Sequence, residues 1–466
     1  MSSINSPNLY LIGTAEYGIS NTPILIDSEE QLISIYGLKG TLIDSYRKIS
    51  SITNVPNIYV FKCNGRHSNV FANIIHQNNV VFKGVEFKAI YSSSEYNNIT
   101  ILFTDAFLQI VSNNKVLEYN FDKYNTIQKL FKAINDDADN CISPISVINY
   151  TLEQISHPAN SLVSCNKPIL VTDGGEDGLE CNKKEIFTSI SKSLNSLYGT
   201  SIDCIIFSDC YIDDYEIDNG EDILNYYKLM LDFCNKQLKY NVITKGVIGF
   251  KPLQELTNST ELLKEHLINY YYKVIDKSNS KYERKNLSLI TVTFGDIYYD
   301  NNRMIDNHYL AYSSVICSED YKNNITNVDY GDKIKINYML PFDVINILKE
   351  LNFVFLRESP LTNKVHIVNA NNMSNEIFAC EYVIRSLQRC YKTFNTVFDD
   401  ILGEAVNNNT EQKINLLVTN TLKQLQKTTA IEKSSFFVRT VDDNTIIEIL
   451  LYFPNYINPI KYFVTK

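Results

Sequence analysis

The chain has 466 residues, of which 44% are hydrophobic and 21% are charged, and its formal net charge is -10. This length is too great for one simple core and predicts two to four domains, while the composition excludes a largely disordered protein. The negative charge argues against a dedicated nucleic-acid binder, which needs a basic stripe, and no stretch approaches the length needed for membrane insertion.

The ten cysteines are scattered singly, without a CxxC pair or histidines at metal-ligand spacing. This pattern favours reduced, buried thiols over a disulfide framework or a zinc site. The N-terminus shows no charged leader followed by an apolar run. We therefore expect a protein that works in the cytoplasm or is assembled there.

Residues 1–80 predict the first part of an α/β domain, because strands and helices alternate there and a sheet with covering helices results from that order. The predicted strands are residues 9–12, 24–26 and 57–63, with a short helix that closes on Gly37 and a second helix at residues 41–50. From residue 81 to 160, short alternating strands, Gly and Asn turns and a helix from Asn125 predict an inserted β-rich module.

The α/β pattern resumes over residues 161–328, where buried strands again alternate with helices of one apolar face. Strands are predicted near residues 168–171, 202–209, 241–250 and 287–295, and helices at residues 184–197 and 223–237.

Residues 329–466 predict a C-terminal α+β domain. A helix and a strand lie within residues 340–358, a hairpin partner follows at residues 365–370, and two amphipathic helices span about 376–402 and 411–426. The last segment reads as two strands separated by Pro454 and Asn455, and Pro459 suits an edge strand because it cannot donate a backbone hydrogen bond. The fold class is therefore multidomain α/β and α+β, ending in an extended strand.

The loop "TDGGEDG" follows a predicted strand, at the edge where open α/β sheets bind ligands. Asp173, Glu176 and Asp177 could hold a metal there. The loop has no lysine, lacks the GxxxxGK[ST] phosphate-binding pattern and misses the carboxylate spacing of a calcium loop. We favour a structural turn.

The remaining polar features are interpreted as structural. The acidic run from Asp203 to Asp218 is expected to be a solvated loop. No serine lies in a GxSxG motif and HExxH is absent, so the sequence predicts no catalytic, cofactor or metal site.

Tyr270, Tyr271 and Tyr272 would spread around a helix, which favours an interface over ligand stacking. The six histidines are expected to be ordinary surface or core residues: His67, His76, His157, His266, His308 and His366.

Several stretches in order resemble contractile phage tail sheath proteins. "LYLIGTAEYGISNTPILIDSEEQLISIYG" is similar to the start of their folded region, and "NIYVFKCNG" stands where they have a strand ending in Val-Arg-Val. "NNITILF" resembles their inserted β module, and "VTDGGEDG" their Gly-Gly-x-Asp-Gly loop. "DKIKINYMLPFDVINILKELNFVFLRESPLTNKVHIVNA" resembles their C-terminal domain, and "TIIEILLYFPNYINPIKYFVTK" their closing strands. The helix "VIRSLQRCYKTFNTVFDDILGE" carries Arg385 or Arg389 at the family's Arg position.

The resemblance implies a non-enzymatic virion protein of the tail, assembled in the host cytoplasm. Six-membered rings of one chain would stack into a helical tube around the inner tail tube protein, with baseplate and tail terminator proteins at its ends. Contraction of this sheath would drive the tube through the host envelope.

The resemblance also implies which residues make contacts. Terminal strands would complete the sheets of neighbouring subunits, a form of strand addition. The subunit-interface residues expected from this are Leu9, Leu11, Ile457, Ile460, Tyr462, Phe463 and Val464. The face towards the tube is expected on a helix of residues 376–426, with Lys413, Lys423 and Lys427 as candidates.

The sequence departs from the family at its start. An N-terminal arm of about twenty residues is usual in that family, whereas only Met1 to Asn8 precede the first predicted strand here. Either the C-terminal strand links neighbours alone, or the chain forms a single sheath-like adaptor or cap ring. An α/β enzyme acting through Asp173 and Asp177 is the alternative from a different class.

Overall fold

The computed structural model describes residues 6–63, 69–75, 81–90, 96–112, 115–140, 142–149, 158–159, 168–173, 179, 181–218, 221–251, 259–280, 289–299, 304–319, 321, 323–336, 338–373, 380–399, 408–441, 444–453 and 456–464. The chain divides into two compact units. One comprises residues 1–11, 45–60 and 191–466, and the other comprises residues 12–44 and 61–190.

An eight-stranded mixed sheet has the strand order β2-β3-β1-β11-β14-β15-β19-β20. Neighbours from β11 to β19 are parallel, and β20 returns antiparallel to β19. The central strands are fully buried, which is typical of parallel strands covered on both faces. The strands are β1 (Asn8–Gly13), β2 (Ile24–Ile26), β3 (Asn57–Lys62), β11 (Cys204–Phe207), β14 (Lys245–Gly249), β15 (Ile290–Phe294), β19 (Val354–Glu358) and β20 (Val365–Val368).

Helices connect these strands. Helix α8 (Tyr309–Ser318) packs against β11, β14 and β15, α5 (Tyr226–Leu238) against β14, and α9 (Phe342–Glu350) against β19. Helix α6 (Thr260–Tyr270) continues through a π-helical stretch (Tyr271–Asp276) into α7 (Lys277–Asn279). Three more helices of the α/β part are α1 (Glu29–Tyr36), α2 (Thr41–Ile52) and α4 (Lys183–Ser193), and α4 is followed by a 3-10 turn (Leu194–Leu197).

The β-rich module consists of two small antiparallel sheets and one helix. Helix α3 (Ile127–Asp139) begins at Thr126, whose side chain caps the backbone N–H of Lys129, and its apolar face contributes to the module's core. Sheet β4-β5-β9 comprises Asn69–Ile75, Val81–Ala89 and Ile145–Asn149. Sheet β10-β6-β7-β8 comprises Ile169–Leu170, Thr100–Phe103, Phe107–Ser112 and Lys115–Asn120.

Two further small sheets belong to the first unit. Strands β12 (Tyr215–Asp218) and β13 (Glu221–Asn225) form a two-stranded antiparallel ribbon. Strands β16 (Asp296–Tyr299), β17 (Met304–Asn307) and β18 (Ile334–Lys335) form an antiparallel sheet with β16 in the centre.

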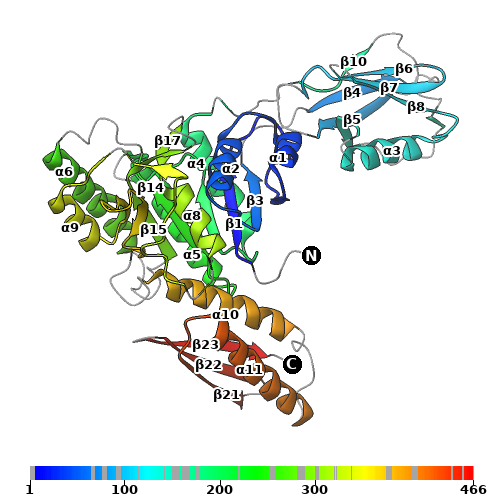
Figure 1. Cartoon of the computed structure of the whole chain (residues 1–466). Coiled ribbons are helices and arrows are strands. Elements are labelled where there is room, and N and C mark those ends of the chain that lie inside the picture. The colour runs from blue at the N-terminus through cyan, green and yellow to red at the C-terminus, as the bar shows by residue number, and fades with distance from the viewer. Residues whose placement is uncertain are drawn as a thin grey trace. The chain divides into compact units, whose positions relative to one another are not determined.

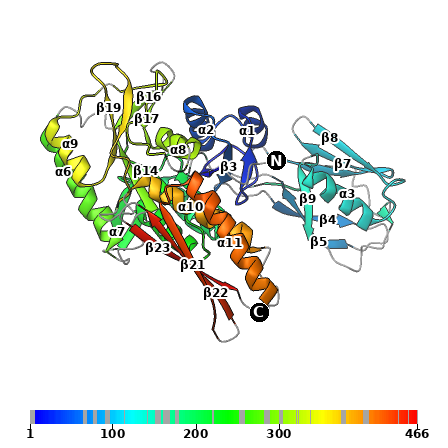
Figure 2. The ribbon, with the colours of Figure 1, turned by 60° about the horizontal axis from the view of Figure 1, so that its bottom comes forward.

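The C-terminal segment forms two long helices and a three-stranded antiparallel sheet. Helix α11 (Asn408–Thr428) lies beside α10 (Glu381–Asp399) and contacts β21 of the sheet, as Figures 1 and 2 show. Ile414, Val418, Leu422 and Leu425 are buried on one face of α11, the spacing of an amphipathic helix. The strands are β21 (Lys433–Val441), β22 (Asn444–Phe453) and β23 (Tyr456–Val464).

The predicted fold class is confirmed: a mixed α/β sheet is combined with β-rich modules and an α+β C-terminal part that ends in a strand. The predicted domain boundaries at residues 80, 160 and 328 stay predictions.

Candidate assembly surfaces

Helix α10 is attached to the large sheet by buried charges. Glu381 forms an ion pair with Lys245 of β14, and its second carboxylate oxygen lies 3.9 Å from Nε of Arg385, one turn along the helix. All three residues are at most 2% exposed. Burial lowers the pKa of the Lys245 ammonium, and the positive charge of the neighbouring Arg385 adds to that effect. Arg385 also donates to the carbonyl oxygens of Glu319 and Asn323.

Further along α10, polar side chains attach to the beginnings of β1 and β11. The Asp203 carboxylate accepts from the backbone N–H of Asn8 at 2.7 Å and from Lys392 Nζ at 3.3 Å. Lys392 also donates to the carbonyl oxygen of Ser6, and Gln388 donates to those of Asp203 and Ile243. Burial raises the pKa of the Asp203 carboxyl, and the neighbouring Lys392 opposes that shift. The start of β1 is thus held by α10 of the same chain.

This arrangement places the two N-terminal interface candidates inside the subunit. Leu9 and Leu11 are 0% exposed, and β1 is an interior strand between β3 and β11. Their predicted contact with a neighbouring subunit stays a prediction.

The C-terminal candidates lie on a strand at the edge of a sheet. Strand β23 pairs with β22 at nine successive positions, from Phe453 opposite Tyr456 to Thr445 opposite Val464. The sheet order β21-β22-β23 leaves β21 and β23 as edges, and Pro459 is accommodated in such an edge strand. Ile457, Ile460, Tyr462, Phe463 and Val464 are therefore positioned on an outer strand, where strand addition is possible.

The predicted tube-facing lysines share one exposed face of α11. Lys413, Lys423 and Lys427 are exposed, and at 100° per residue they fall within about 80° of one another around the helix. Leu416 lies within the same arc and is 63% exposed. The face thus combines positive charge with an apolar centre.

The acidic run proves less solvated than the sequence predicted. Asp203 and Asp214 are buried, and Asp214 forms a 2.5 Å ion pair with Lys251. Glu216 and Asp218, on the ribbon of β12, are exposed as expected. The expectation of a solvated loop is therefore wrong for Asp203 and Asp214, which form ion pairs with Lys392 and Lys251.

The alternative enzyme site is not assembled by the described residues. Asp173 is exposed at the end of the segment that follows β10, while Glu176 and Asp177 lie outside the described residues. Among the residues that the structure describes, no three His, Cys, Asp or Glu side chains are grouped to hold a metal ion.

None of the described helices is long and apolar enough to cross a bilayer.

Of the histidines, His308 is fully buried. Its Nδ1 lies 3.3 Å from the Gly295 carbonyl oxygen, and burial lowers the pKa of its ring to about 3. His266 is half-buried beside Phe250 and Tyr270, and burial lowers its pKa. His67, His76 and His157 lie outside the described residues.

The tyrosine run begins where α6 becomes π-helical. Tyr270 packs edge-on against Phe250 and Tyr271 against Phe353, whereas Tyr272 is 60% exposed. The prediction that the run spreads around a helix is confirmed, and two of the three rings contact this chain's own core.

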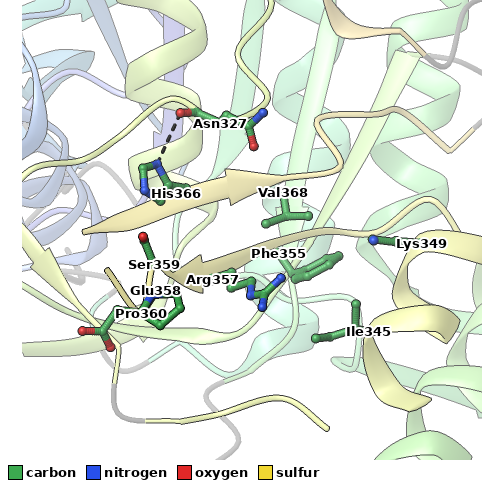
Figure 3. Close-up of a pocket in the computed structure, with 10 residues that line it drawn as sticks. All are labelled: Asn327, Ile345, Lys349, Phe355, Arg357, Glu358, Ser359, Pro360, His366 and Val368. Carbon is green, nitrogen blue, oxygen red and sulfur yellow. Dashed lines mark hydrogen bonds between the residues drawn. The ribbon is translucent and has the colours of Figure 1, made fainter. Parts of the chain in front are cut away.

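A pocket of about 440 Å³ lies between α9 and the β19–β20 pair (Figure 3). Ile345 and Lys349 line it from α9, and Phe355 and Arg357 from β19. An adjoining cavity of about 410 Å³ shares several of these residues and extends to Met339. No sequence pattern indicated this pocket, because its two walls are assembled by tertiary packing.

Comparison with solved structures identifies proteins of the same fold. A sheath tail protein of Listeria innocua aligns over 99% of this chain and 95% of its own, with a TM-score of 0.59 and 13% identity. A sheath tail protein of Desulfitobacterium hafniense aligns over 99% of this chain and 97% of its own, with a TM-score of 0.55 and 9% identity. The sequence itself matches no protein-family model and no curated protein.

Proposed function

We propose that this protein is the sheath subunit of a contractile phage tail or a related phage-tail-like particle. The observation that carries the proposal is the likeness of fold, over 99% of the chain, to sheath tail proteins of two bacteria. The order of sequence motifs supports the same role. The role is structural and non-enzymatic, and its location is the tail of the particle.

In this role, copies of the chain form six-membered rings that stack around an inner tube, and contraction drives the tube through the host envelope. The exposed basic face of α11 is the surface we assign to the tube. Because the partner surface must then be acidic, the contact is partly electrostatic and weakens with salt.

Links between copies are assigned to the C-terminal sheet. Strand β23 pairs with β22 in its own chain, and the same pairing with β22 of a neighbouring copy would exchange identical elements without requiring new chemistry. Each backbone hydrogen bond contributes only about 0.5–1.5 kcal/mol net, so a long strand is needed for one firm link. The nine paired positions meet that need.

The test is removal of the last strand. A variant lacking residues 456–466 should remain folded by circular dichroism and elute as a monomer that forms no rings or tubes in electron microscopy. A synthetic peptide of those residues, supplied in excess, should restore assembly. Normal tubes from the truncated chain would contradict the role of β23, and rings limited to a single layer in the intact chain would indicate an adaptor or cap.

A further inference from the structure

The pocket between α9 and β19 has an apolar part and a cationic part. Ile345 and Lys349 are one helical turn apart on α9, and Phe355 and Arg357 are two residues apart on β19, so each pair shares a face. Each wall therefore contributes one apolar and one cationic side chain. His366 adds a third nitrogen-bearing group, and Glu358 is the carboxylate of the lining (Figure 3).

Among the described residues, the cationic side chains of the pocket have no carboxylate partner. Lys349 and Arg357 make no ion pair within the described part of the chain. In a protein of net charge -10, two such cations beside an apolar wall favour a ligand that carries negative charge.

Three exposed apolar side chains lie on or next to elements that line this pocket and the adjoining cavity. Met339, which lines the adjoining cavity, is 97% exposed, and Leu361, next to the lining residue Pro360, is 94% exposed. Phe342, at the start of α9, is 74% exposed. Large apolar side chains gathered in this way mark an interaction surface. The fitting partner has an exposed apolar side chain next to carboxylates.

The ribbon of β12 and β13 has this combination. Ile217 is 52% exposed, and of the exposed large hydrophobic residues in the described part of the chain it alone lies between two acidic residues, Glu216 and Asp218. Ile217 lies directly opposite Asp222 of β13, beside a register shift between Glu216 and Ile217. The exposed carboxylates of Glu216 and Asp218 flank it along the strand. This combination of an exposed apolar side chain and neighbouring carboxylates matches the apolar and cationic parts of the pocket.

The ribbon and α9, which forms one wall of the pocket, are bound to different ends of the helix that runs from α6 through the π-helical stretch to α7. Asp222 of the ribbon binds Lys277 in α7 at 2.9 Å, and Asp343 of α9 binds Lys264 in α6 at 3.4 Å. The helix from α6 to α7 separates these lysines by 13 residues, about 20 Å at 1.5 Å per residue. A ribbon that docks into this pocket must therefore come from another copy.

We propose that the β12–β13 ribbon of one copy docks into the pocket between α9 and β19 of a second copy, with Ile217 on Ile345 and the carboxylates of Glu216 and Asp218 on Arg357 and Lys349. This contact is heterologous, because two different surfaces of the same chain meet, and it propagates into rings or helical stacks. The inference rests on the proposed function and specifies one of its subunit contacts.

Cross-linking tests this contact on the full-length protein. Asp218→Cys and Leu361→Cys place one thiol on the ribbon and one at the pocket mouth of the same chain, and a short bis-maleimide is then added. The double variant should give a ladder of dimers and higher oligomers, whereas each single variant should give no higher oligomers. A cross-link within one chain, or attachment only to another protein of the expressing cells, would overturn the proposal.

Charge reversal provides the second measurement. Arg357→Glu and Asp218→Arg should each weaken self-association by about tenfold in light scattering, and combining them in one chain should restore most of it. Lys132→Glu, at an exposed position of α3, is the matched control and should change nothing. Loss without recovery in the double variant would contradict the contact.

The outcomes separate this inference from the proposed function. If the protein forms tubes in electron microscopy and gives a ladder of cross-linked oligomers, both the sheath role and the ribbon contact are supported. Tubes without cross-linked oligomers overturn only the ribbon contact. A ladder without rings or tubes would support the contact and contradict the sheath role. Absence of both assembly and ladder would overturn both.

Discussion

Replacing Glu381 with alanine should strongly destabilise the protein. The substitution leaves the Lys245 ammonium, 1% exposed, without its carboxylate partner, and it removes the negative charge nearest to Arg385. Breaking a buried pair by removing one partner costs about 3–5 kcal/mol, because an uncompensated charge stays buried. The free energy of unfolding should fall by that amount.

The double substitution Lys245→Met with Glu381→Leu is the matched control. It removes both charges and keeps a similar volume, so its cost should stay within about 1–2 kcal/mol. Arg385 remains hydrogen-bonded to the carbonyl oxygens of Glu319 and Asn323 in this variant. The double variant should therefore be more stable than Glu381→Ala alone.

Urea unfolding measures this difference. Because the chain has no tryptophan, far-ultraviolet circular dichroism and tyrosine fluorescence are the suitable signals. A loss below about 1 kcal/mol in Glu381→Ala, or a double variant less stable than the single one, would refute the assignment of a tightly coupled buried pair.

Two further predictions concern pH and salt. His308 has its pKa lowered to about 3, so between pH 6.5 and 3 the unfolded chain binds the extra proton; stability should fall on acidification by up to about 1.4 kcal/mol per pH unit. His308→Gln should reduce that slope in urea titrations, and an unchanged slope would contradict the prediction. Replacing Lys413, Lys423 and Lys427 together with glutamate should abolish binding to tail tubes without changing stability by more than about 1 kcal/mol. Tube binding that is unchanged, or independent of salt, would show that another face contacts the tube.

Local patterns predicted much of the fold. The strands at β1, β2, β3 and β11 and the helices α5 and α9 follow from runs of apolar residues and their periodicity. The break at Pro454 and Asn455 was predicted because proline favours a turn between strands, and β22 ends at Phe453 while β23 begins at Tyr456.

Helix α8 was missed because it is buried on all sides and has no amphipathic pattern. Its residues from Tyr309 to Cys317 are all buried, and the hydroxyl groups of Ser313 and Ser314 donate to backbone carbonyl oxygens of the same helix. Periodicity cannot distinguish such a segment from a buried strand.

Surface properties were harder to predict than secondary structure, because they depend on distant partners. Asp203 belongs to an acidic run typical of solvated loops, yet Lys392, 189 residues away, neutralises it in the interior. Likewise, the pocket walls at Ile345 and Phe355 come from a helix and a strand whose packing no local pattern specifies.

Negative-stain electron microscopy of the purified full-length protein, over a range of concentrations, tests the central claim most directly. A sheath subunit should form six-fold rings in end view that stack into tubes in side view. A protein that stays monomeric at every concentration, with and without added tail tubes, would contradict the sheath role.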